Sequence, residues 1–261
     1  MDLDPDLAAL RSLGGFFVLR TLPPPPPPPP PAAAADGTGP HRLPTLGEAY
    51  DGVAPDGRHD ALTLRVATVG ARLGTAEPRV AASLAQQGLA ARLWSAALGC
   101  AVLYGRLPSL DPGLLRWDPL ASVPDDLWLT GVRTLPGDAD AVAVAAAVLD
   151  AHLEPLGAAL RARYGVAAGL LRGNAGSALA ATARELARWA RAHGRTDAVE
   201  RARALTGELF THPLLRATGA RAGTAFRRHS CCLYYRVPGG GLCGDCCLTR
   251  LPRSSPRAAS G

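Results

Sequence analysis

The stretch Pro78-Arg-Val-Ala-Ala-Ser-Leu-Ala-Gln-Gln-Gly-Leu-Ala-Ala-Arg-Leu-Trp-Ser-Ala-Ala-Leu-Gly-Cys-Ala-Val-Leu-Tyr104 shows the apolar periodicity of an α-helix. Pro78 suits the first turn of such a helix, and Gly105 suits the position just past its end. We therefore expect a long helix from Arg79 to Tyr104. Its apolar positions at helical spacing are Val80, Leu84, Ala91, Trp94, Ala97, Leu98 and Ala101.

Further helical patterns follow towards the C-terminus. Asp138 is expected to cap a helix that Pro155 kinks or restarts, and Asn174 to cap the next one. Asp197 and Glu200 predict a capping box for a third helix. Residues 127–133 favour a strand or extended segment. The fold class is therefore predicted as mainly α, or α+β with a few minor strands, in a single domain.

The composition excludes two classes of protein. Hydrophobic residues make up 48% of the 261 residues, which excludes a disordered chain. The most apolar run, 139–149, is shorter than the roughly 18 to 20 residues that a membrane-spanning helix needs, so we expect no transmembrane segment. The acidic N-terminus, Met1-Asp-Leu-Asp-Pro-Asp, does not resemble a secretory signal. We expect a cytoplasmic protein.

The net charge of +6 comes from a chain whose 28 basic residues are all arginine. These arginines are scattered along the predicted helices and are not interleaved with aromatic residues on one face. We therefore expect no nucleic-acid partner.

The chain divides into five parts by composition. Nine consecutive prolines, Pro23 to Pro31, predict polyproline II, and the Ala/Gly/Pro-rich residues after them predict a disordered linker. The expected parts are residues 1–22, an N-terminal part of the domain; 23–44, the Pro-rich insertion or linker; 45–226, the mainly helical domain; 227–249, a metal-binding segment; and 250–261, a disordered tail.

Five of the six cysteines fall within the predicted metal-binding segment. They are Cys231, Cys232, Cys243, Cys246 and Cys247, with the spacing C-C-x10-C-x2-C and one further adjacent cysteine. In a reducing compartment such a cluster indicates metal binding or redox chemistry before disulfides. Four thiolates from two close pairs satisfy either a tetrahedral zinc ion or the two irons of a [2Fe-2S] cluster.

Two features favour the cluster over zinc, although the spacing alone does not separate them. Zinc modules normally use a C-x2-4-C knuckle at both ends, and this chain has that knuckle at one end only. A four-thiolate [2Fe-2S] centre is also strongly negative, and several arginines lie near it in sequence to offset that charge. They are Arg227, Arg228, Arg236 and Arg250.

Other candidate residues fit structural roles. Cys100 lies on the long apolar helix, where we expect a small buried hydrophobe. His152 and His193 are expected to pack or cap, and His229 to lie outside the ligand set. The chain has no G-x-x-x-x-G-K-[ST] and no G-x-G-x-x-G between a strand and a helix, so these motifs predict no nucleotide site.

The segment Arg227-Arg-His-Ser-Cys-Cys-Leu-Tyr-Tyr-Arg-Val-Pro-Gly-Gly-Gly-Leu-Cys-Gly-Asp-Cys246 closely resembles the C-terminal signature of the FhuF-like ferric-siderophore reductases. Weaker similarity extends through residues 79–94 and 173–180. In that family the motif holds a [2Fe-2S] cluster, so the resemblance implies that Cys231, Cys232, Cys243 and Cys246 are the ligands. Cys247 departs from the family pattern and is an alternative to Cys246.

The resemblance also implies a function. A siderophore holds Fe(III) through anionic oxygen ligands and holds Fe(II) far less tightly, so one electron from the cluster releases the metal. The implied activity is a one-electron ferric-siderophore reductase that receives electrons from an unidentified donor. We expect the ferric chelate near the cysteine segment and the helices that contain Arg92, Trp94 and Asn174. The alternatives are a zinc-stabilised binding module and an iron-sulfur carrier or sensor.

Overall fold

The computed structural model describes residues 4–22, 43–52 and 60–252 of the chain. The described residues form a mainly α fold with minor strands, as the sequence predicts. The elements in chain order are α1 (Asp4–Ala9), η1 (Leu10–Leu13), η2 (Gly15–Phe17), β1 (Arg20–Thr21), α2 (Leu46–Asp51), α3 (Ala61–Leu73), α4 (Pro78–Tyr104), β2 (Leu115–Trp117), β3 (Leu127–Leu129), α5 (Ala141–Ala145), η4 (Ala146–Leu153), α6 (Glu154–Tyr164), α7 (Ala168–Ala192), α8 (Thr196–Leu209), β4 (Gly219–Ala222), β5 (Ala225–Arg228) and η5 (Tyr234–Arg236).

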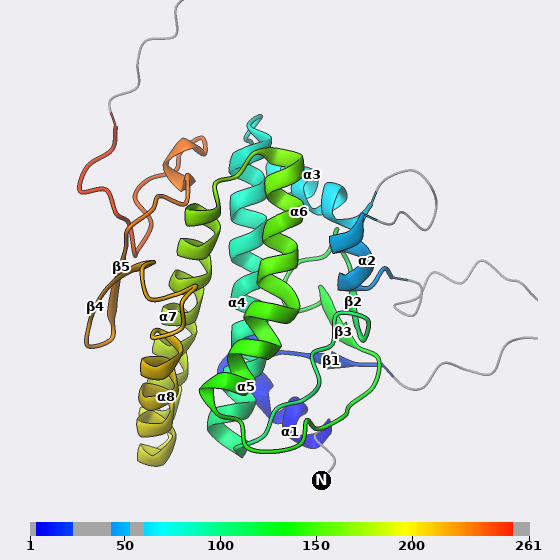
Figure 1. Ribbon diagram of the computed structural model, residues 1–261, viewed down its shortest axis with the longest axis vertical. Helices are drawn as coiled ribbons and strands as arrows, with labels where there is room; N and C mark the ends of the chain where they lie inside the picture. The colour runs from blue at the N-terminus through cyan, green and yellow to red at the C-terminus, as the bar shows by residue number, and fades with distance from the viewer. Residues whose placement is uncertain (1–3, 23–42, 53–59, 253–261) are drawn as a thin grey trace, which may run out of the picture.

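Helix α4 is the central element, and Figure 1 shows it between α7 and α6. It contacts α3, α6, α7 and α8, so it buries residues on nearly all of its faces rather than along one stripe. Pro78 occupies its first turn, and Gly105 adopts the left-handed conformation (φ 67°) that ends it. The predicted helix and both of its end signals are confirmed.

Helices α5, η4 and α6 form one continuous helical run. The side chain of Asp140, not Asp138, caps it by accepting a hydrogen bond from the amide of Ala143 (2.8 Å), so the predicted cap is wrong by two residues. The middle section, η4, is π-helical and ends at Leu153, two residues before Pro155, which lies in the first turn of α6. Because proline lacks an N–H, the regular hydrogen-bond ladder cannot continue through it.

The continuous helix Ala141–Tyr164 extends well beyond residues 139–149, which are the most apolar run of the sequence. By length and composition alone it could cross a membrane, with a hydropathy of 1.4 over an 18-residue window. Of that window, 44% is buried inside the protein, where the run packs against α4 and α8. Figure 1 accordingly shows α6 lying against α4 along the bundle.

Helices α7 and α8 exist as predicted, but the two predicted caps are wrong. Helix α7 begins at Ala168, so Asn174 lies inside it and is fully buried. Helix α8 begins at Thr196 without a side-chain cap, and Asp197 instead pairs with Arg195 (2.8 Å). In both cases the polar side chain that was expected to cap a helix pairs with an arginine instead.

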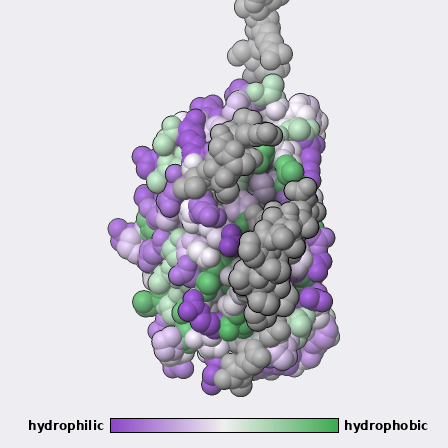
Figure 2. All heavy atoms as spheres, turned by 90° about the vertical axis from the view of Figure 1, so that its right-hand side faces the viewer, coloured by the Kyte–Doolittle hydropathy of each residue, from purple (hydrophilic) through white to green (hydrophobic). Residues whose placement is uncertain are grey.

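A three-stranded sheet has the order β1-β3-β2, with β1 parallel and β2 antiparallel to β3. The strand expected over 127–133 is confirmed as the shorter β3. The sequence of residues 111–115 is typical of a short helix, but residues 112–114 form a turn and Leu115 begins β2. Figure 2 faces the side of the molecule that carries this sheet and shows hydrophilic and hydrophobic residues interspersed there.

The predicted Pro-rich insertion or linker falls almost entirely outside the described residues. Its last two residues are described: the carbonyls of Leu43 and Pro44 accept hydrogen bonds from Arg116 (2.7 Å) and from the amide of Trp117 (2.8 Å). Most of the predicted C-terminal tail, 253–261, also lies outside the described part of the chain.

A second sheet, the hairpin of β4 and β5, was not expected from the sequence. The two strands pair antiparallel, with Gly219 opposite Arg228, and β5 packs on α7. Since β5 runs directly into the cysteine segment, the hairpin sets where that segment meets the helices (Figure 1).

Candidate metal centre

The cysteine segment follows β5 and contacts both central helices. The hydroxyl of Ser83, on α4, donates to the carbonyl of Cys232 (2.8 Å), and Ser230 Oγ donates to the carbonyl of Gly169 on α7 (3.0 Å). Cys232 is the most buried of the five cysteines, with 2% of its surface exposed. The other four are half-buried, so the group lies just beneath the surface.

Arg228, the last residue of β5, holds the segment in place. Its side chain is 1% exposed, and its guanidinium donates to the side-chain oxygen of Asn174 and to the carbonyls of Ser230 (3.0 Å) and Leu170 (3.4 Å). Asn174 in turn donates to the carbonyl of Ser83 (2.9 Å). One network therefore joins α4, α7 and the cysteine segment, and it satisfies a buried cation with polar partners.

Asp245, between Cys243 and Cys246, holds the second half of the segment. Its carbonyl accepts a hydrogen bond from the amide of Arg228 (3.0 Å), and its carboxylate accepts one from Ser177 Oγ on α7 (2.7 Å). Arg184, two turns further along α7, forms an ion pair with the same carboxylate (3.2 Å). Asp245 thus fixes the C-x2-C turn against α7.

Glycines on α7 permit this close packing. A Cβ atom at Gly173 would collide with Ser230 Oγ, and one at Gly176 would collide with Thr218 Oγ1. The sequence alone did not assign a role to either glycine.

Four of the cysteine sulfurs share one backbone pattern. In each case the amide two residues further along the chain faces the sulfur. Leu233 donates to Cys231 (3.3 Å) and Leu248 to Cys246 (3.4 Å). Such amide hydrogen bonds stabilise negative charge on sulfur, which is the charge that a metal-bound thiolate carries. The amides of Tyr234 and Asp245 likewise act to lower the pKa of Cys232 and of Cys243, respectively.

The backbone bends sharply to supply these amides. Leu233 adopts the left-handed conformation (φ 71°), which is uncommon for a branched residue. It lies directly after the adjacent pair Cys231 and Cys232, so the strained residue is the one that turns its amide back towards Cys231.

The thiols influence one another electrostatically. A hydrogen bond from Cys243 lowers the pKa of Cys232 to about 6, and the charge of Arg228 acts in the same direction. The same hydrogen bond raises the pKa of Cys243. Burial raises the pKa of Cys231, and the charges of Cys232, Cys247 and Cys246 raise it further. The hydrogen bond from Cys243 and the charge of Arg228 thus favour the thiolate form of Cys232, which is the form that binds iron.

These sulfurs fit the donor set that a metal centre needs, although they do not form a closed coordination shell. Within the described residues, no three His, Cys, Asp or Glu side chains are arranged to hold a single metal ion. The fit rests on the mutual proximity of soft anionic donors, on the amides that face them and on the buried cation of Arg228.

Cys247 differs from the four cysteines with a shared pattern. Its carbonyl accepts a hydrogen bond from Arg227 (3.2 Å), while the neighbouring Cys246 presents its sulfur to the amide of Leu248. Cys246 thus has the amide contact that Cys231 has, whereas Cys247 lies close enough to Cys231 for its charge to raise the pKa of that thiol.

The remaining candidates have other contacts. Cys100 is fully buried in α4, where burial raises its pKa to about 12, and it is roughly 25 Å along the helix from Ser83. His229 is turned towards the carbonyl of Ala217 (3.1 Å). Of the four arginines near the cysteines in sequence, Arg228 is the one whose charge lowers the pKa of a sulfur, and Arg236 pairs with Glu77 (2.8 Å).

Arg92 and Trp94 do not line an open site beside the cysteines. Arg92 is 1% exposed and pairs with Asp126 (3.0 Å), and Trp94 is fully buried with its indole N–H donating to the carbonyl of Ala175 (3.1 Å). Of the three residues expected near the chelate, Asn174 alone lies in the network that holds the cysteine segment.

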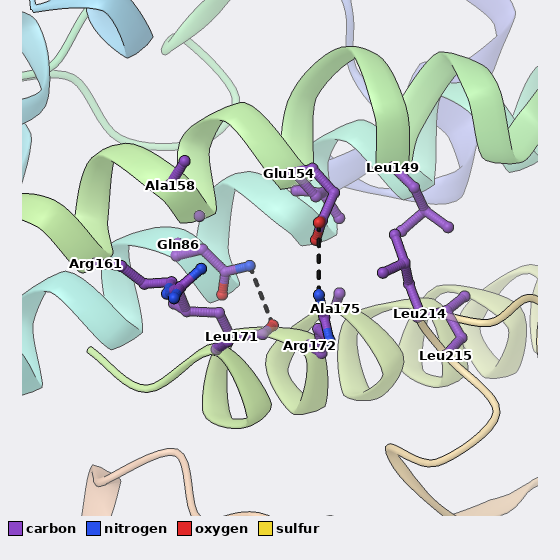
Figure 3. A pocket seen from close by; sticks show the side chains of 13 residues that line it. Gln86, Leu149, Glu154, Ala158, Arg161, Leu171, Arg172, Ala175, Leu214 and Leu215 are labelled. Atoms are coloured by element: carbon purple, nitrogen blue, oxygen red, sulfur yellow. Dashed lines mark hydrogen bonds and ion pairs between the residues drawn. The ribbon is translucent and has the colours of Figure 1, made fainter. Parts of the chain in front are cut away.

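A small cavity of about 80 Å³ lies between α4, α6 and α7 (Figure 3). Glu154 and Arg172 form an ion pair across it (3.6 Å), and Gln86 donates to the carbonyl of Leu171 (3.3 Å). Its volume suits a few water molecules and is far below that of a ligand pocket.

Comparison with known families identifies the cysteine segment. Residues 228–248 match the family model described as the FhuF 2Fe-2S C-terminal domain. The match includes Cys231, Cys232, Cys243, Cys246 and Cys247, and it gives the segment's cofactor as a [2Fe-2S] cluster. The similarity noted over residues 79–94 and 173–180 lies outside this match. A search of curated proteins finds no match to the chain.

Proposed function

We propose that this protein is a ferric-siderophore reductase in which Cys231, Cys232, Cys243 and Cys246 hold the [2Fe-2S] cluster. The observation that carries the proposal is the shared amide pattern at these four sulfurs, within the segment that matches the FhuF 2Fe-2S domain. Zinc modules and iron-sulfur carriers use similar ligands, but the family match supports the siderophore-related alternative.

When bound, a [2Fe-2S] cluster supplies one electron at a time. Reduction of a ferric siderophore requires one electron, which converts Fe(III) to Fe(II). Because Fe(II) is held far less tightly by the anionic oxygens of the chelate, the metal is then released and the siderophore remains chemically unchanged. A separate electron donor must return one electron to the protein before the next turnover.

The residues around the sulfurs suit this reaction. The four amides and the buried guanidinium of Arg228 stabilise negative charge at the sulfurs, and such interactions make reduction of a cluster easier. Three of the four ligands are half-buried, so the centre lies close enough to the surface for a bulky chelate to approach it. Free thiols of this kind are maintained in a reducing compartment, and we place the reaction in the cytoplasm.

The direct test mixes the reduced protein anaerobically with a ferric siderophore in the presence of an Fe(II)-specific chromophore. We expect the visible spectrum of the oxidised protein to return while the Fe(II) complex forms. The trap is needed because removing Fe(II) draws forward a reduction that is unfavourable alone. If no ferric chelate reoxidises the protein under these conditions, the reductase proposal is wrong and a carrier or sensor role replaces it.

A further inference from the structure

A larger cavity, of about 330 Å³, lies between α7, α8 and the β4–β5 hairpin. We call it the arginine groove, because four arginines line it and no acidic residue does. Its volume is at the lower end of the range typical of small-molecule sites. The four arginines are Arg184 and Arg191 on α7, Arg203 on α8 and Arg221 on β4.

The positive charge of the groove is largely uncompensated. Arg184 pairs with Asp245, but among the described residues no carboxylate forms an ion pair with Arg191, Arg203 or Arg221. Arg221 instead lies over the ring of Phe210, 4.7 Å from its centroid. The small cavity of Figure 3 differs in this respect, since Glu154 offsets Arg172 there. The groove therefore attracts anions.

The walls between the arginines are apolar. Buried small side chains from both helices, Ala180, Ala187 and Ala202, leave room in the groove, and Phe226 from β5 closes one side. Thr206 is 5% exposed and lines the same cavity, and its hydroxyl has no hydrogen-bond partner among the described residues. A ligand that combines apolar bulk with anionic oxygens matches this lining.

The groove adjoins the cysteine segment through one side chain. Arg184 lines the groove and forms its ion pair with Asp245 (3.2 Å). Asp245 lies between Cys243 and Cys246, and its amide faces the sulfur of Cys243. A ligand held in the groove beside Arg184 is thus next to the C-x2-C turn, which is where an electron acceptor needs to lie.

We propose that the arginine groove is the substrate site of the reductase and selects ferric chelates with a net negative charge. This inference rests on the proposed function, which it deepens by naming the class of substrate. A tricatecholate complex of Fe(III) is strongly anionic and presents aromatic rings, whereas a trihydroxamate complex lacks that negative charge. The arginines and the apolar walls match the tricatecholate chemistry, and the carboxylate type of chelate shares its anionic oxygens.

Binding is tested with gallium(III) complexes, because Ga(III) resembles Fe(III) in size and charge but does not accept the electron. The holoprotein is titrated with the gallium complex of a tricatecholate, of a polycarboxylate and of a trihydroxamate, and affinity is measured by calorimetry. We expect both anionic complexes to bind more tightly than the trihydroxamate and to weaken as salt is added. Equal or tighter binding of the trihydroxamate would overturn the inference.

The location is tested with the double variant Arg191→Gln/Arg203→Gln. Both side chains are exposed, so the fold and the visible spectrum of the cluster should be retained. The matched control is Arg188→Gln, an exposed arginine on α7 that pairs with Glu185 and does not line the groove. We expect the double variant to bind the gallium tricatecholate on the order of tenfold more weakly or worse, and the control to bind as the wild type does.

The two proposals fail in different ways. In one outcome, the wild type binds the gallium tricatecholate, the double variant does not bind it, and the ferric complex does not reoxidise the reduced wild type. The groove is then a binding site, and the reductase proposal is wrong. If ferric chelates reoxidise the wild type and the double variant equally fast at low chelate concentration, the reductase proposal holds and the groove is not its substrate site.

Discussion

The hydroxyl of Ser83 donates a hydrogen bond to the main-chain carbonyl of Cys232, 2.8 Å away, although 149 residues separate the two in sequence. Ser83 is fully buried in the central helix α4, and Cys232 is the most buried cysteine of the metal-binding segment. The position of the sulfurs is therefore set by the core of the bundle and not by the cysteine segment alone.

The ligand set predicts a sharp division among the cysteines. Serine at Cys231, Cys232, Cys243 or Cys246 should remove most of the iron and sulfide, because each sulfur carries part of the cluster charge. Cys100→Ser and Cys247→Ser should retain both, as measured by iron and sulfide analysis and by visible absorption. A full-strength spectrum in Cys246→Ser, with loss of the cluster in Cys247→Ser, would move the fourth ligand to Cys247.

The network around Arg228 predicts that Asn174→Ala is destabilising. The substitution removes an acceptor from a buried cation and a donor to Ser83, and we expect a loss of about 2–3 kcal/mol in the free energy of unfolding. The cluster should also be lost faster on dilution, because the segment is less firmly held. Arg188→Gln serves as the control, and equal stability of the two variants would show that the network contributes little.

A second buried cation, Arg92, lies on α4 itself. Arg92 pairs with Asp126 (3.0 Å), and both are about 2% exposed or less. Asp126→Asn should cost about 3–5 kcal/mol, because it leaves a buried guanidinium without its anion. Asp125→Asn removes the partner of Arg20 at the surface and should cost less than about 1 kcal/mol. Chemical denaturation of both variants measures the difference.

His152 predicts a pH dependence of stability. It is fully buried, and burial lowers its pKa from 6.5 to about 4. Its Nε2 faces the carbonyl of Leu110 and must donate, so its Nδ1 accepts from the hydroxyl of Tyr50 (2.9 Å) and the ring is neutral. The unfolded chain therefore binds a proton at a higher pH than the folded chain does, and stability falls as the pH drops below 6.5.

We expect this group to remove about 2 kcal/mol of stability between pH 7 and pH 5. His152→Gln should be less stable at pH 7 but should lack this part of the pH dependence. The comparison uses denaturation of both holoproteins at each pH, so that effects of pH on the cluster are shared. If the free energy of unfolding changes equally with pH in the two proteins, His152 does not titrate as its burial indicates.

Local patterns predicted the long helix α4 well, because the spacing of its apolar residues and its end signals at Pro78 and Gly105 are properties of the segment itself. They failed for Asn174, since the same side chain can cap a helix or bind a distant buried arginine. They also missed the β4–β5 hairpin, whose residues 219–228 are rich in glycine, alanine and arginine and do not alternate in hydropathy.

The metal-binding segment could be predicted because the spacing of its cysteines within the chain is itself the signal. The arginine groove could not, because its lining comes from α7, α8 and the hairpin, and the charge of each arginine is uninformative in a chain where every basic residue is arginine. The role of Ser83 was likewise hidden, since its partner is the carbonyl of a residue far away in sequence.

The most direct test of the central claim is the stoichiometry of a single turnover. The protein is reduced, freed of excess reductant and mixed anaerobically with a ferric chelate and an Fe(II) trap, and both the cluster spectrum and the trapped Fe(II) are followed. We expect one Fe(II) for each cluster that is reoxidised, with the same rate in both signals. Reoxidation without Fe(II), or no reoxidation with either anionic or hydroxamate chelates, would contradict it.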